Sequence, residues 1–181
     1  MLRLLLILRA SCAILLLGAV PNALAAQDTS ESEATALLLT PLSFFKEDDL
    51  DFGDIIPGST AGTVVMDSTG AVTTTGGVVQ IDGTQQVARF WGYGQFNQRV
   101  LINVDANAHT LTREGGTETM VMDQILIGSQ PPTVISTNPR RFRIVNANGY
   151  FAFSLAGRLR VGANQAPGIY RGEFSVTLEY E

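Results

Sequence analysis

The stretch from Ile169 to Tyr180, IYRGEFSVTLEY, decides the fold class of this chain. Apolar residues and glycine alternate in it with polar and charged residues, so one set would face a core and the other would face water. The first set is Tyr170, Gly172, Phe174, Val176, Leu178 and Tyr180. The second set is Arg171, Glu173, Ser175, Thr177 and Glu179. A period of two over twelve residues predicts a β-strand with one buried face.

The preceding segment, Tyr150–Val161, has the same period. Its apolar set is Phe151, Phe153, Leu155, Leu159 and Val161, and small or basic residues stand between them. A shift of one residue would turn either apolar set toward water, so the pattern specifies the register of both strands.

The rest of the chain contains short β-branched and aromatic runs between turn residues, without an apolar pattern of helical period. The further predicted strands are Ala36–Phe45, Gly62–Met66, Val78–Ile81, Val87–Tyr93, Arg99–Val104, Thr119–Ile127 and Phe142–Val145. Many short strands with regular turns are typical of an all-β, immunoglobulin-like antiparallel β-sandwich. We expect one such domain over residues 34–181, after a polar and mobile segment at 27–33.

The first 26 residues have the composition of a cleaved secretory signal peptide. Arg3 and Arg9 supply positive charge, an apolar stretch follows, and Ala23-Leu24-Ala25 offers small residues for cleavage. The alternative of a retained membrane anchor is weaker, because the apolar run is interrupted and shorter than the roughly 20 residues that span a bilayer. Export to the periplasm, cell surface or medium is therefore expected, with no membrane span left after cleavage. Cleavage would remove the only cysteine, Cys12, and would change the net charge from −5 to −7.

Composition also argues against several function classes. Only 16% of the residues are charged and the balance is acidic, so a basic surface for nucleic acid is not expected. One cysteine and one histidine provide neither a disulfide framework nor a cysteine zinc site. The acidic run from Glu47 to Asp54 fails the calcium-loop pattern, since counting from Asp49 puts Asp54 and Thr60 at the sixth and twelfth positions. We expect no cofactor, no metal and no catalytic residue.

Three further features of the sequence bear on possible sites. If Ala88 and Phe90 face the core, Trp91 and Tyr93 lie side by side on the outer face, where they could bind a glycan or a protein. The lone His109, in a polar loop without a partner motif, is predicted to be a surface residue. The basic run Arg140–Arg143 is predicted to form salt bridges with the acidic run.

The end of the chain resembles the C-terminal signature of bacterial chaperone–usher pilins. Gly168 is fourteenth from the end, Tyr180 is second from the end, and alternating apolar residues lie between. Further matches are Pro41-Leu42-Ser43, Leu50-Asp51-Phe52-Gly53, Gly58, Gly62-Thr63-Val64-Val65, Gly76-Gly77-Val78, Ala88-x-Phe90 and Gly94. Together they resemble a secreted family of unknown function in the pilin and adhesin superfamily, related to the archaic, spore-coat-U-like pilins.

This resemblance implies an incomplete immunoglobulin-like sandwich that accepts a strand from a periplasmic chaperone or a like subunit. The contact edge would comprise Gly168, Tyr170, Gly172, Phe174, Val176, Leu178 and Tyr180. The sequence departs from the pattern at the donor segment, because the residues before Ala34 are polar. Either Ala34–Phe45 is itself the donated segment, or the subunit does not polymerise by strand exchange.

Three functions therefore compete: a non-enzymatic structural subunit or adhesin of the envelope surface, a self-complete binding module using Trp91 and Tyr93, and, least favoured, a hydrolase. Strand pairing separates the first two. In a complete domain the last two strands would form a hairpin, with Val161 opposite Tyr170 and Leu155 opposite Val176. In an incomplete pilin domain they would lie in opposite sheets, and the last strand would have a free edge.

Overall fold

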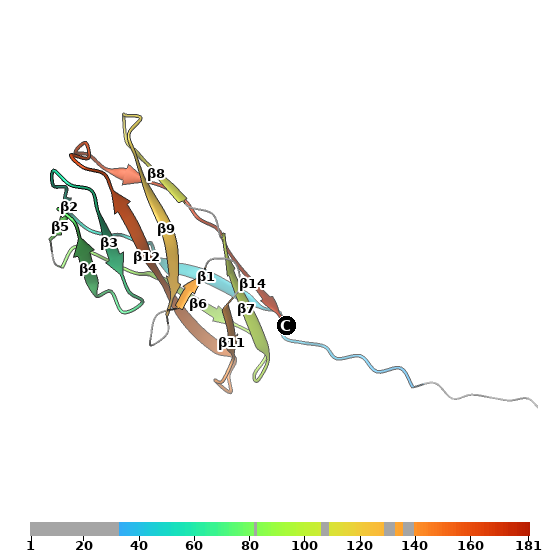
Figure 1. Cartoon of the computed structure of the whole chain (residues 1–181). Helices are drawn as coiled ribbons and strands as arrows, with labels where there is room; N and C mark the ends of the chain where they lie inside the picture. Colours follow the sequence, from blue (N-terminus) through green and yellow to red (C-terminus); the bar gives the residue numbers. More distant parts are fainter. Residues whose placement is uncertain (1–32, 82, 106–108, 129–132, 136–139) are drawn as a thin grey trace, which may run out of the picture. The chain divides into compact units, whose positions relative to one another are not determined.

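The protein is an antiparallel β-sandwich without helices among the residues that the structure describes (Figure 1). The structure is a computed structural model that describes residues 33–81, 83–105, 109–128, 133–135 and 140–181. The predicted signal peptide, residues 1–26, and most of the polar segment lie outside these ranges. The sandwich itself is the compact unit Leu37–Glu181. No described helix has the length and apolar character needed to cross a membrane.

The larger sheet has nine strands. Its main path runs through β1 (Ser43–Asp48), β6 (Ala88–Tyr93), β12 (Tyr150–Val161), β9 (Thr119–Ile127), β8 (His109–Arg113) and β13 (Tyr170–Arg171). Three strands branch from this path: β3 (Gly62–Met66) on β12, β4 (Val72–Thr75) on β3, and β10 (Thr133–Ile135) on β9. The central strand β12 pairs with β9 along one side, and with β6 and then β3 along the other.

The smaller sheet has three strands, in the order β11 (Arg140–Arg143), β7 (Arg99–Val104) and β14 (Val176–Tyr180). A separate pair is formed by β2 (Ile55–Ile56) and β5 (Val79–Gln80). The two larger sheets share one hydrophobic core, in which Leu155 and Leu159 of β12 belong to the same cluster as Ile102 and Val104 of β7. This is the two-layer packing expected when each sheet has one apolar face.

Four predicted strands have the observed bounds: Gly62–Met66, Arg99–Val104, Thr119–Ile127 and Tyr150–Val161. The strand predicted at Ala36–Phe45 is wrong at its start, because β1 begins at Ser43 and pairs with β6. Leu37 and Leu38, which made the run look like a strand, have 78% and 88% of their surface exposed. Apolar composition predicted a strand there, but no neighbouring strand pairs with it in the described part of the chain.

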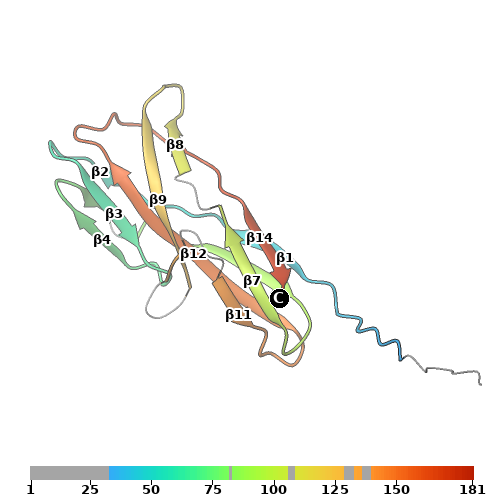
Figure 2. The ribbon, with the colours of Figure 1, turned by 45° about the vertical axis from the view of Figure 1, so that its right-hand side comes forward.

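The prediction of one strand over Ile169–Tyr180 is also wrong. The segment forms β13 beside β8 in the larger sheet. It then forms β14 beside β7 in the smaller sheet (Figure 2). The connection includes Gly172, where an added Cβ would lie 2.7 Å from the carbonyl oxygen of Thr110. The alternation of the side chains nevertheless persists: the inward residues from Phe174 to Tyr180 are partly buried and those between them are exposed.

The last two long strands do not form a hairpin. Strand β12 lies in the larger sheet and β14 in the smaller one, so Leu155 and Val176 are not partners. Arg158 of β12 donates two hydrogen bonds of 2.8 Å to Asp123 on β9, within the larger sheet. The pairing is the one described above for an incomplete domain.

Candidate functional site

The C-terminal strand β14 is at the edge of the smaller sheet. Among the described strands it pairs with β7 alone. At the two ends of the ladder, Ser175 accepts a hydrogen bond from Asp105 and Glu181 donates one to Arg99. Because bonded and non-bonded pairs alternate in an antiparallel ladder, the backbone N–H and C=O groups of Val176, Leu178 and Tyr180 point away from β7. These groups form the open edge.

The inward side chains of β14 are less well covered than those of its neighbour. On β7, Val100, Ile102 and Val104 have at most 1% of their surface exposed. Their partners across the ladder are Tyr180, Leu178 and Val176, and all three are only partly buried. Strand β7 has a partner on both sides, whereas the other side of β14 has no strand partner in the described structure. The partial exposure is therefore a consequence of position at the edge.

Tyr180 connects this edge to the N-terminal segment. Its hydroxyl donates to the carbonyl oxygen of Thr40 at 2.7 Å and accepts from the backbone N–H of Gln95 at 2.6 Å. Thr40 is also held through its own hydroxyl, which donates to the Gln95 side chain at 2.9 Å. The exposed residues Leu37 and Leu38 thus precede a segment that is anchored beside the end of β14 (Figure 2).

The residues predicted for the contact edge divide between two places. Phe174, Val176, Leu178 and Tyr180 lie on or just before β14, as expected for an edge. Gly168, Tyr170 and Gly172 lie on or around β13, so placing them on the same edge was wrong. Gly168 has a φ of +146°, and the Tyr170 hydroxyl donates to the Ala166 carbonyl at 2.7 Å. These three shape the turn that leads into the crossing between the sheets.

Trp91 and Tyr93 lie on the outer face of the larger sheet, as predicted, and β1 and β12 add further aromatic residues beside them. Across the ladders, Phe45 is opposite Trp91 and Tyr150 is opposite Tyr93. The rings of Tyr93 and Tyr150 have centroids 4.0 Å apart, and a hydrogen bond with Tyr150 raises the pKa of Tyr93. All four aromatic side chains are exposed. The register of β6 with β1 and β12 brings these four side chains together. This register cannot be predicted from the alternation of residues within β6 alone.

The prediction for His109 is wrong. It begins β8, is buried, and packs against Phe174 with ring centroids 5.9 Å apart. One ring nitrogen lies 3.1 Å from the carbonyl oxygen of Asp105, which provides the polar partner that a buried imidazole needs. The residue is a structural support for the crossing segment.

The charged runs are also arranged differently from the prediction. Glu47 and Asp48 of the acidic run belong to β1. Arg141 forms an ion pair with Glu181 at 2.6 Å, and Arg143 donates to the Asn97 carbonyl at 2.7 Å, so their partners lie outside the acidic run. The described residues contain no group of three or more His, Cys, Asp or Glu side chains placed to hold a metal ion.

These features define an all-β, immunoglobulin-like domain whose last strand has one unpaired side in the described structure. The chain belongs to the family described as "Domain of unknown function (DUF4402)", whose model matches residues 42–180. The match begins just before β1 and ends with β14, so it covers the whole sandwich. No curated protein matches the chain significantly.

Proposed function

We propose that this protein is a non-enzymatic structural subunit or adhesin of the bacterial envelope surface, and that it assembles by strand addition at β14. The observation that carries the proposal is the edge itself. Val176, Leu178 and Tyr180 direct backbone N–H and C=O groups outward, and their side chains line an incompletely covered part of the core. An added strand would form hydrogen bonds with these backbone groups and would cover these side chains.

An open apolar edge is an aggregation hazard unless another chain or segment covers it. The proposal therefore includes a periplasmic chaperone that covers β14 before assembly, followed by a second copy of this chain. The pattern of residues 1–26 supports export into a compartment where such a chaperone would act. The resemblance to pilins favours the same order of events.

The donor in this proposal is the segment around Leu37–Leu39. Ser43–Phe45 cannot be donated without removing β1 from its own sheet, because they pair with β6. The exposed Leu37 and Leu38, by contrast, pair with no strand in the described structure and precede the anchored Thr40. The donor would thus be shorter than the whole Ala34–Phe45 run.

A synthetic peptide, ATALLLTPL, which copies Ala34–Leu42, tests the proposal against the exported full chain. We expect the peptide to bind saturably and to raise the unfolding temperature. Amide hydrogen exchange should slow at Val176, Leu178 and Tyr180, whose N–H groups face outward. The amides of Thr177 and Glu179 should change much less, because they already bond to β7.

The matched control peptide carries aspartate in place of the residues corresponding to Leu37 and Leu38, and it should not bind. The proposal is wrong if the exported chain, purified alone, is a stable monomer whose Val176, Leu178 and Tyr180 amides are already protected. It is equally wrong if the native peptide binds but leaves the exchange of these three amides unchanged.

A further inference from the structure

A groove on the outer face of the larger sheet provides a second site. It lies where β12 changes partner, since Leu155 is the last residue paired with β6 and Gly157 is the first paired with β3. The turn between β3 and β4 borders one side. Two hollows of about 440 and 590 Å³ share Thr69, Val87 and Arg89, so they form one groove. Each has the volume of a small-molecule site.

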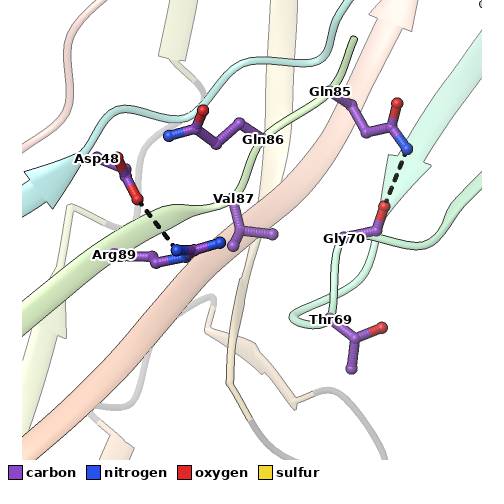
Figure 3. Close-up of a pocket in the computed structure, with 7 residues that line it drawn as sticks. All are labelled: Asp48, Thr69, Gly70, Gln85, Gln86, Val87 and Arg89. Atoms are coloured by element: carbon purple, nitrogen blue, oxygen red, sulfur yellow. Dashed lines mark hydrogen bonds and ion pairs between the residues drawn. The ribbon is translucent and has the colours of Figure 1, made fainter. Parts of the chain in front are cut away.

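The walls combine several kinds of polar group. Figure 3 shows Asp48 and Arg89 on one side of the first hollow and Thr69, Gly70 and Gln85 on the other, with Gln86 between them. Arg89 is 3.5 Å from the Asp48 carboxylate, and its side chain is still 57% exposed. One guanidinium, one carboxylate, two carboxamides and one hydroxyl therefore line the same space.

Trp91 forms the aromatic wall of the second hollow. Its indole N–H donates to the carboxylate of Glu47, which restrains the ring, and 42% of its surface remains exposed. The opposite border is also held in place. Ser154 donates to the Ser68 carbonyl at 2.9 Å, and Asp67 accepts from both the N–H and the hydroxyl of Thr69. The groove is thus formed before any ligand binds.

This set of groups determines the class of ligand. The carboxylates of Glu47 and Asp48 offset the single guanidinium, so the groove does not favour a polyanion such as nucleic acid. The first hollow, which is lined mainly by hydroxyl, amide and charged groups, is a poor match for a lipid or an apolar peptide. A sugar has many hydroxyls that both donate and accept hydrogen bonds, and one ring face made of C–H groups that packs on an aromatic plane.

We propose that the groove binds a neutral saccharide, with one sugar ring stacked on Trp91 and hydroxyls bonded to Arg89, Gln86 and Thr69. This function goes beyond strand addition and is separable from it, because the groove is on the larger sheet and β14 is in the smaller one. A subunit bound through β14 would leave its Trp91 groove available. The protein would then combine assembly with adhesion.

Trp91 is the only tryptophan of the chain, so its fluorescence reports on this groove alone. The exported full chain is titrated with lactose, maltose, cellobiose and mannobiose, after a screen on immobilised neutral and acidic oligosaccharides. We expect a saturable change in emission with at least one neutral sugar. Arg89→Ala and Gln86→Ala should each weaken binding at least tenfold with little change in unfolding temperature.

The matched controls lie on the same face, outside the lining of either hollow: Phe45→Ser and Tyr150→Ser should bind like the unchanged chain. The inference is overturned if no neutral sugar gives a saturable signal, or if binding survives the Arg89→Ala/Gln86→Ala double variant. It is also overturned if emission changes only with protein concentration, since Trp91 would then lie in a protein interface. None of these results depends on peptide binding at β14.

Discussion

The Tyr180 hydroxyl donates a hydrogen bond of 2.7 Å to the backbone carbonyl of Thr40, which lies 140 positions earlier in the chain. Leu42, two residues after Thr40, packs with Leu178 and Tyr180 around the small buried cluster of Val100, Ile144 and Phe151. The final strand therefore holds the segment that leads into the first strand.

Tyr180→Phe should lower the free energy of unfolding by about 1–3 kcal/mol, because it removes the bonds to Thr40 and Gln95. The phenyl ring keeps its packing, so the cost is that of the hydroxyl alone. Urea denaturation measures it, and limited proteolysis near Leu37 and Leu38 should become faster. The exposed Glu179→Ala is the control and should change neither measurement.

Leu178→Asp should lower the free energy of unfolding by about 3 kcal/mol or more, because it places a carboxylate against the core. Thr177→Asp, at the next position, faces solvent and should cost less than about 0.5 kcal/mol. Glu173→Ala, also exposed, should be nearly silent. Similar losses for the three variants in urea would contradict the assignment of faces on β14.

The stability of the fold should depend on acid through Asp123. Hydrogen bonding from Arg158 chiefly, and from Arg160, holds the pKa of Asp123 below its ordinary value of 3.8. A lowered pKa in the folded state means that the stabilisation is present above the ordinary carboxyl pKa and is lost as the pH falls through the lowered one. As the pH falls below about 5, the free energy of unfolding of Asp123→Asn should therefore decrease less than that of the unchanged chain. The difference should develop over a range of about 3 pH units or less.

Gly172→Ala should destabilise the protein by about 1–3 kcal/mol, because the new Cβ would lie 2.7 Å from the Thr110 carbonyl oxygen and 3.2 Å from Leu111 Cγ. The neighbouring backbone must move to make room. Thermal unfolding measures the loss. Ser175→Ala, an exposed side chain in the same crossing, is the control, and an equal loss there would show that contact at Gly172 is not the cause.

The strands with the clearest alternation were predictable because alternation is a local property. In β12 and β7, every second residue faces inward. Both strands have the predicted bounds. Of the two-residue strands, β2 was not predicted and β5 was predicted as the longer Val78–Ile81, since so short a run has no measurable period. Their pairing depends on contact between segments far apart in sequence.

The candidate site was predictable only in part. The inward positions Phe174 to Tyr180 followed from the pattern, whereas the change of sheet before Val176 did not, because alternation continues through it. The groove beside Trp91 had no local signal. Arg89 and Trp91 come from β6, but Thr69 and Ser154 come from a turn and a strand that only the fold brings beside them.

By itself the sequence determined the all-β class, the two faces of the long strands and the inward residues of the last one, because each depends on the order of side chains along one segment. Tertiary structure decided which sheet each strand joins, which edge is open and which side chains share the Trp91 groove. Those properties depend on pairing between distant segments, and the backbone hydrogen bonds that make such pairs are the same for every side chain.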